Sequence, residues 1–231
     1  MIGNKSLILV LALTLPIHVA AEDTPWYIGV AGGATEITDF PTPDDVRDAV
    51  GQEIDIGNAN FPQENSLDDR DTAWKLFMGY NFNPYIGLEA FYADLGEANA
   101  KWSAAYLSGF PFIGGGKVGG SVDYSAETVG LYLVASYPFT ERFSFHGKAG
   151  AHYYDAEVTV EAFSEGLAFV DTSISKTADD TGTDFVFGAG LVYDFSPRWG
   201  VTVEWERFSG VDFEGIDIEI EVLSACLLFR F

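Results

Sequence analysis

The strongest constraint in this sequence is a threefold repeat of alternating apolar and polar residues around short turns. Three stretches share the pattern: residues 74–92, 131–154 and 185–208. In each, a turn around a proline separates two alternating runs, and Tyr, Phe or Trp flanks the turn. A period of two with a turn-forming residue at the break predicts a β-hairpin. One more alternating run, residues 26–34, precedes the first hairpin, and another follows the last and ends at Phe231, so the sequence predicts eight strands.

The segments between the predicted strands are of two kinds. Short turns lie on one side, together with both ends of the strand array, and polar segments lie on the other. We expect these polar segments to be loops, at about residues 35–72, 95–127, 156–183 and, more briefly, 209–221. A soluble sandwich would rarely carry three such loops. Short turns at one end, long loops at the other and an even strand number are typical of an outer-membrane barrel. The predicted fold is therefore all-β: an eight-stranded antiparallel up-and-down transmembrane β-barrel over residues 22–231.

The first 21 residues have the features of a secretory signal peptide. Lys5 precedes an apolar run at residues 7–15, and small residues at 19–21 suit a signal peptidase that cleaves before Glu22. A transmembrane helix is the alternative, but the run is too short and Pro16 breaks it. Loss of Lys5 changes the formal net charge from −23 to −24. Such a charge argues against nucleic acid as a partner, and the single cysteine, Cys226, allows no internal disulfide.

The two faces of the predicted strands differ in kind. One face is apolar with aromatic residues near the short turns, and the other carries the mid-strand charges and most of the glycines. A lipocalin would turn the apolar face inward, but it has no reason to gather aromatics at one rim, whereas a membrane barrel has aromatic girdles at its interfaces. The predicted girdle comprises Tyr80, Phe82, Tyr85, Tyr137, Tyr193, Trp199, Phe229 and Phe231, with Phe139 and Phe195 at the same level.

The opposite phase places charged residues inside the barrel. Lys75, Glu89, Lys148 and Glu204 lie at similar distances from their turns, and an eight-stranded lumen is only wide enough to be filled by side chains. A one-residue slip of register would turn Lys75 or Lys148 toward lipid at a cost of about 2–4 kcal/mol. We expect these four residues to form a buried charge network that plugs the lumen, with His146, His152 and Glu206 as further polar lumen residues. The alternative is a polar pathway for ions or a proton relay.

At these residues the sequence resembles the OmpA-like transmembrane barrel family. "GYNFNPYIGLE" (79–89) is similar to that family's second strand, turn and third strand, including the inward Glu89. "SYPFTERF" (136–143) resembles its second periplasmic turn, with Lys148 at an inward basic position. "LVYDFSPRWGVTVEW" (191–205) resembles its third, with Glu204 at an inward acidic position, and the terminal "FRF" resembles its last strand.

The resemblance also has limits and further implications. Val134, Val192 and Thr202 stand where a well-known member of the family has lumen charges, so the network is either smaller here or completed by Lys75 and the histidines. Two-domain members carry a peptidoglycan-binding domain after the barrel, and we expect none in the sequence given. An ending such as Phe231 also resembles the signal that the barrel assembly machinery reads.

The remaining residues bear on other functions. The acidic loops are most simply a solvated face; the alternatives are divalent cations held beside lipopolysaccharide phosphates, or repulsion of anions. Residues 102–120 are apolar and glycine-rich, and would either fold over the barrel mouth or form a binding patch. Ser136, Ser144, His146 and His152 face the lumen, but no motif for a nucleophile and its base surrounds them.

The prediction is therefore an integral multi-pass β-barrel of the outer membrane of a Gram-negative bacterium, with a structural or surface-interaction role. A narrow pore for ions or small solutes is the alternative, and a lipid-modifying enzyme a distant third. We expect no catalytic residues, metal or cofactor. The expected partners are outer-membrane lipid and lipopolysaccharide, the assembly machinery through Phe231, and an extracellular ligand at the loops, with the protein itself a monomer.

Overall fold

A computed structural model describes residues 25–38, 41–53, 63–106, 116–166, 171–213 and 216–231. The signal segment predicted at residues 1–21 lies outside them. The described elements are β1 (Trp26–Thr38), α1 (Pro43–Glu53), β2 (Gln63–Asp68), β3 (Arg70–Asn83), β4 (Ile86–Tyr106), β5 (Gly116–Pro138), β6 (Phe143–Gly166), β7 (Thr172–Asp194), β8 (Trp199–Phe213) and β9 (Ile216–Arg230).

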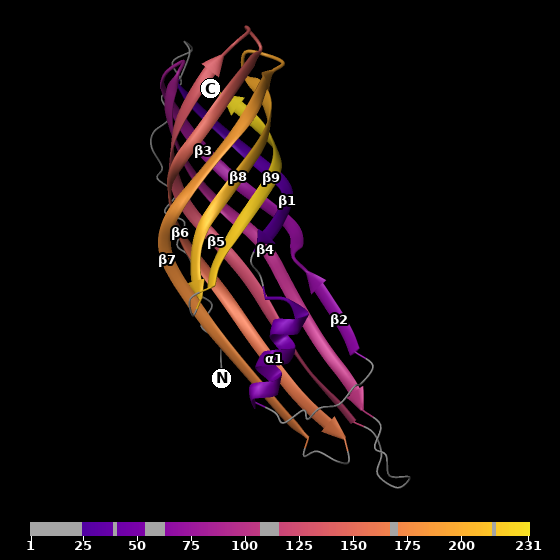
Figure 1. The fold of residues 1–231 in the computed structure, drawn as a ribbon. Helices are drawn as coiled ribbons and strands as arrows, with labels where there is room; N and C mark the ends of the chain where they lie inside the picture. The colour runs from indigo at the N-terminus through magenta and orange to yellow at the C-terminus, as the bar shows by residue number, and fades with distance from the viewer. Residues whose placement is uncertain (1–24, 39–40, 54–62, 107–115, 167–170, 214–215) are drawn as a thin grey trace.

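Eight of these strands close into a barrel, and β2 is an addition outside the ring (Figure 1). Each ring strand pairs antiparallel with its neighbours in chain order, and β9 pairs with β1 from Tyr27–Arg230 to Thr38–Glu219. The last alternating run of the sequence therefore closes the barrel, and no edge is left in the ring itself. The predicted eight-stranded antiparallel barrel is confirmed.

The side chains alternate with a charged interior and an apolar exterior. In β3, Lys75 and Phe77 are buried, whereas Leu76 and Met78 are 51% and 47% exposed. In β8, Glu204 is buried while Val203 is 60% exposed. A barrel in water would show the reverse pattern, whereas a continuous apolar outer face around a charged interior is typical of a barrel in lipid. The structure thus has the register that the positions of the charges predicted.

Four strands continue far beyond the closed ring. β4, β5, β6 and β7 have 21 to 24 residues, whereas a tilted strand crosses a bilayer with about 9–11. The expectation of long loops at residues 35–72, 95–127, 156–183 and 209–221 is therefore wrong for most of their length, because these segments are paired strands, with α1 and β2 in the first of them. Residues 107–115, 167–170 and 214–215, which fall within or beside these predicted loops, lie outside the described residues.

The extension beyond the ring, formed by the outer halves of β4–β7, has a small apolar core that explains its strands. Ala98, Ala100 and Trp102 alternate on the inner face of β4 and are buried, as are Ala156 and Val158 of β6. Because these side chains pack inward at every second residue, pairing continues after the membrane-spanning part ends. The β4–β5 register shifts between Asp94 and Glu97, where Gly96 has a φ of 84°, and this bulge lies between ring and extension.

One edge of the extension is covered by the chain that follows β1. β2 pairs with β4 from Gln63–Ala104 to Asp68–Asn99, and α1 packs against β4 and β5 with Val46 buried. Thr42 and Asp45 cap α1 reciprocally: the Thr42 amide donates to Asp45 Oδ2 over 2.8 Å, and the Asp45 amide donates to Thr42 Oγ1 over 3.4 Å. Within the described part of the chain, no helix is long and apolar enough to cross a membrane.

Candidate functional site

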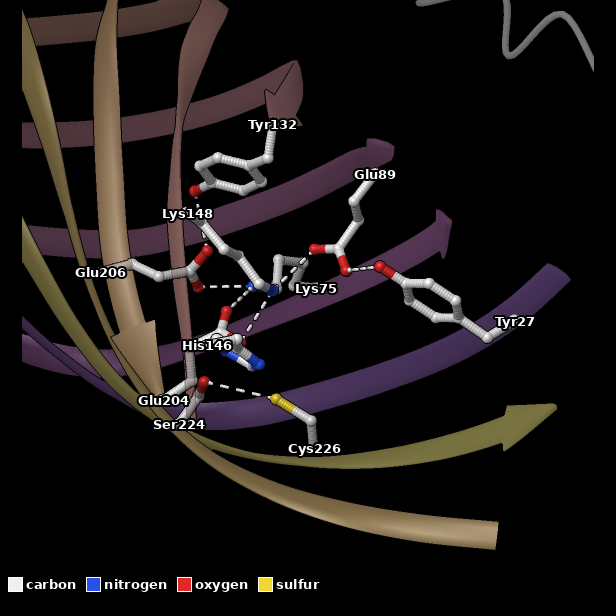
Figure 2. A network of polar contacts seen from close by, with 10 residues as sticks. All are labelled: Tyr27, Lys75, Glu89, Tyr132, His146, Lys148, Glu204, Glu206, Ser224 and Cys226. Carbon is white, nitrogen blue, oxygen red and sulfur yellow. Dashed lines mark hydrogen bonds and ion pairs between the residues drawn. The ribbon is translucent and has the colours of Figure 1, made fainter. Parts of the chain in front are cut away.

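A cluster of charged side chains fills the middle of the lumen (Figure 2). Lys75 comes from β3, Glu89 from β4, Lys148 from β6, and Glu204 and Glu206 from β8. Each of the five is at most 5% exposed. Successive side chains of a strand alternate between the two faces of the barrel wall, and these five all point inward. Because the lumen of an eight-stranded barrel is only wide enough to be filled by side chains, residues far apart in the sequence meet there.

The two lysines connect the three carboxylates. Lys148 Nζ donates to Glu89 Oε1 and to Glu204 Oε2, each over 2.7 Å. Lys75 Nζ donates to Glu204 Oε1 over 2.6 Å and to Glu206 Oε2 over 2.5 Å. Glu204 is therefore the shared acceptor at the centre of the cluster. The structure thus brings together Lys75, Glu89, Lys148 and Glu204, and it adds Glu206 as a full member.

Neutral groups complete the cluster at its margins. Tyr27 donates its hydroxyl to Glu89 Oε2 over 2.8 Å, and Tyr132 donates to Glu206 Oε1 over 2.7 Å. His146 Nε2 lies 3.0 Å from Glu204 Oε2. Sequence reasoning missed both tyrosines, although the inward phase set by Glu89 on β4 indicates Tyr132, its cross-strand partner on β5.

The charges of the cluster nearly balance one another, and aromatic rings stabilise the lysines further. Two lysines face three glutamates, so the formal charge is −1 with a neutral His146 and zero with a protonated one. Both lysine Nζ atoms lie 5.4 Å from the centroid of Phe77, which stabilises the cations further. Buried charges arranged in this way hold one another in place, because removing one partner leaves another uncompensated.

An aromatic layer lies on the extracellular side of the charges. Phe91 stacks on Tyr132 with centroids 4.6 Å apart and meets Phe208 edge-on at 6.0 Å. His152 packs edge-on against Phe208 at 5.4 Å. His152 therefore belongs to this upper layer, where its ring nitrogens meet Thr128 Oγ1 at 2.9 Å and the Ser209 carbonyl at 3.1 Å, and it does not touch the charged cluster.

The remaining space in the lumen is divided by the cluster. A cavity of about 70 Å³ lies toward the short turns, lined by Glu89, Lys148, Glu204 and Arg230 among others. Arg230 pairs with Asp194 at 2.5 Å beside its outer end. On the extracellular side, next to Lys75 and Glu206, the space is only about 10 Å³, which suffices for one water molecule at most. The cluster stands between these two cavities.

The predicted girdle residues lie on the outer surface at the turn end of the barrel. Trp199 meets Phe229 edge-on with centroids 4.9 Å apart, and Phe229 meets Phe231 at 5.3 Å. The rings of Tyr80 and Phe82 on β3 meet edge-on with centroids 5.3 Å apart. The other three lie exposed or partly exposed at the same end: Tyr85, Tyr137 and Tyr193.

The acidic residues in the described part of the extension are spread over neighbouring strands. Within the described residues, no three His, Cys, Asp or Glu side chains are grouped so that they could hold a metal ion. Several carboxylates lie opposite one another on neighbouring strands, such as Glu127 opposite Asp155 and Glu157 opposite Asp179.

The comparisons with known proteins agree with this architecture. Residues 6–231 match the family described as the outer membrane protein beta-barrel domain. The chain belongs to this outer-membrane β-barrel family. It is therefore an integral outer-membrane protein of Gram-negative bacteria.

Curated relatives place this barrel more narrowly, and a solved structure shares its fold. It is 25% identical to outer membrane protein A of Shigella flexneri over 82% of the chain, and 26% identical to that of Klebsiella pneumoniae over 80%. It spans only 42% of the length of either relative. The crystal structure of Neisserial surface protein A shares its fold, with a TM-score of 0.50 at 10% identity over 91% of this chain and 99% of that one. The barrel is thus of the outer membrane protein A type.

Proposed function

We propose that this protein is a non-conducting, non-enzymatic outer-membrane barrel whose lumen is closed by the charged cluster, and whose role is structural or one of surface interaction. The observation that carries the proposal is the bridging of three buried carboxylates by Lys75 and Lys148, which come from different strands of the ring. An ion that crossed this level would have to displace several charge-assisted hydrogen bonds between side chains that are at most 5% exposed.

The aromatic layer supports the same proposal. Phe91, Tyr132 and Phe208 lie directly above the charges, and the cavity on that side, beside Lys75 and Glu206, has a volume of only about 10 Å³. A hydrated ion pathway needs a continuous polar channel. The two small cavities on either side of the cluster favour closure over conduction.

The lumen histidines favour packing over catalysis. Catalysis by a serine nucleophile needs that serine within hydrogen-bond distance of a base. Among the described residues, His146 contacts Glu204 and His152 contacts Thr128 and the Ser209 carbonyl, and neither is hydrogen-bonded to a serine hydroxyl. We further propose that the monomeric barrel contacts outer-membrane lipid and lipopolysaccharide through its apolar outer face, and that nucleic acid is not a partner.

Solute flux tests the closure. Purified barrel is reconstituted into phospholipid vesicles, and the swelling of the vesicles measures the entry of a small sugar. We expect no entry above that of empty vesicles for the wild type. Glu89→Ala removes a carboxylate from the cluster and should raise entry. A wild-type rate well above the empty vesicles would contradict the proposal and favour the narrow pore.

A further inference from the structure

The outer half of β7 has a neighbour on one side only. β7 pairs with β6 along its whole length, from Thr172–Ser164 to Tyr193–Phe143, whereas its pairing with β8 covers only Val186–Asp194. Among the described residues, no strand pairs with the other side of residues 172–185 (Figure 1). The opposite border of the extension is covered by β2, so the sheet has one covered edge and one open edge.

Two hydrogen bonds show which backbone groups point to the open edge. The Asp194 amide donates over 2.8 Å to the carbonyl of Arg142, the residue just before β6, so even-numbered amides of β7 point to β6. The Phe185 amide instead donates to the side chain of Asp184 over 2.6 Å, at the position where pairing with β8 stops. Because the β6–β7 register has no shift, the odd-numbered amides from Ser173 to Thr183 point away from β6.

This open edge carries charged residues but lacks three other features that prevent strand addition. Exposed edges are also kept from pairing by being short, bulged or interrupted by proline. Residues 172–185 contain no proline, their register with β6 is continuous, and Lys176 is the one basic residue among them. Their remaining charges are Asp179, Asp180 and Asp184.

The carboxylates near the edge indicate the charge of a partner. Asp179 lies directly opposite Glu157 on β6, and both are exposed. Like charges directly opposite on neighbouring strands destabilise the pair. A cation on a third strand next to Asp179 would relieve this repulsion. Asp180, on the other face, already accepts a hydrogen bond from the Tyr154 hydroxyl over 3.3 Å.

We propose that the open edge of β7, residues 172–185, binds an extended protein segment rich in Lys or Arg by adding it to the sheet as a further strand. The backbone groups of the odd-numbered residues supply the hydrogen bonds, and Asp179, on the exposed face opposite Glu157, selects the basic side chains. This inference rests on the surface role proposed above and names the class of partner for it.

Hydrogen exchange on the full-length barrel in lipid nanodiscs tests the proposal. The probe is a synthetic peptide of alternating threonine and lysine, about as long as the edge, and the reference is the same peptide with glutamate for lysine. We expect the lysine peptide to slow exchange at the odd-numbered amides between Ser173 and Thr183, and the glutamate peptide to leave them unchanged.

Two variants at one position separate strand addition from simple charge attraction. Thr177→Pro removes an outward-pointing amide, and proline is tolerated on an edge where its nitrogen faces solvent. Thr177→Val keeps that amide, and both variants lose the 3.0 Å contact with the Thr159 hydroxyl. We expect Thr177→Pro to weaken peptide binding at least about tenfold, and Thr177→Val to change it by less than about threefold.

Several results would overturn the inference. One is equal binding of the lysine peptide by Thr177→Pro and the wild type, and another is equal binding of the lysine and glutamate peptides. The third is protection of the β7 amides that rises with protein concentration in the absence of peptide, which would indicate pairing between two copies of the barrel. Absence of binding by a wild-type barrel that admits no solute overturns this inference alone. Solute entry through a barrel that binds the peptide overturns the proposed closure alone.

Discussion

Removal of Lys148 is the perturbation to which the charged cluster should respond most clearly. Its Nζ lies 2.7 Å from both Glu89 and Glu204, and its side chain is 2% exposed. In Lys148→Met, Glu204 keeps Lys75 and His146, but Glu89 keeps only the hydroxyl of Tyr27. Loss of one partner from a buried ion pair costs about 3–5 kcal/mol because the other charge stays buried and uncompensated.

The free energy of unfolding in urea, measured in phospholipid vesicles by tryptophan fluorescence, checks this value. Lys148→Met should lower it by about 3–5 kcal/mol. The double variant Lys148→Met/Glu89→Gln removes the stranded charge, so we expect it to recover about 1–3 kcal/mol of that loss. Lys101→Met, at an exposed lysine of the extension, is the control and should change stability by at most about 0.5 kcal/mol.

Two outcomes would refute this reasoning. The first is a cost below about 1 kcal/mol for Lys148→Met, which would mean that the lumen is hydrated enough to screen Glu89. The second is a double variant as unstable as the sum of its two single variants, because independent effects would show that Lys148 and Glu89 are not coupled.

Three further predictions concern other parts of the barrel. Deletion of Phe231 should impair membrane assembly more than deletion of Asp171 at the β6–β7 tip, and equal surface levels would contradict this. Gly150→Val should lower the folded yield on gels, since a Cβ there would overlap the backbone oxygen of Leu131 on β5, whereas Gly147→Ala, with nothing within 4 Å, should not. Burial raises the pKa of Tyr124 in the extension above its usual 10.0, so its contribution to stability is present below pH 10 and is lost as the pH rises further. The urea midpoint should therefore fall above about pH 10 in the wild type and less in Tyr124→Phe.

The sequence predicted the barrel and most of its interior because both follow from a period of two. Once Leu76 and Met78 are assigned to lipid, Lys75 must face the lumen, and the same argument applies to Glu204 between Val203 and Trp205. The heights of the four charges above their turns then predict that they meet. Tyr27 was not predicted because no charged residue set the phase of β1.

The extension was mistaken for loops because its inner face carries a weak signal. Ala98, Ala100 and Ala104 alternate with polar residues, but alanine differs little in hydropathy from the glycine and serine around it. Pairing of β2 with β4 joins segments separated by α1, and nothing local in residues 63–68 specifies that partner. The open edge of β7 likewise exists only because β8 ends its pairing at Phe208, which is a property of the whole sheet.

Electrical conductance across a planar lipid bilayer tests the closed lumen most directly. The account predicts that insertion of the purified wild-type barrel leaves the current at the baseline of the bare bilayer. Glu89→Ala, which leaves Lys148 with Glu204 alone, should produce discrete openings. Large, steady conductance steps from the wild type, equal to those of Glu89→Ala, would contradict the claim that the charged cluster closes the barrel.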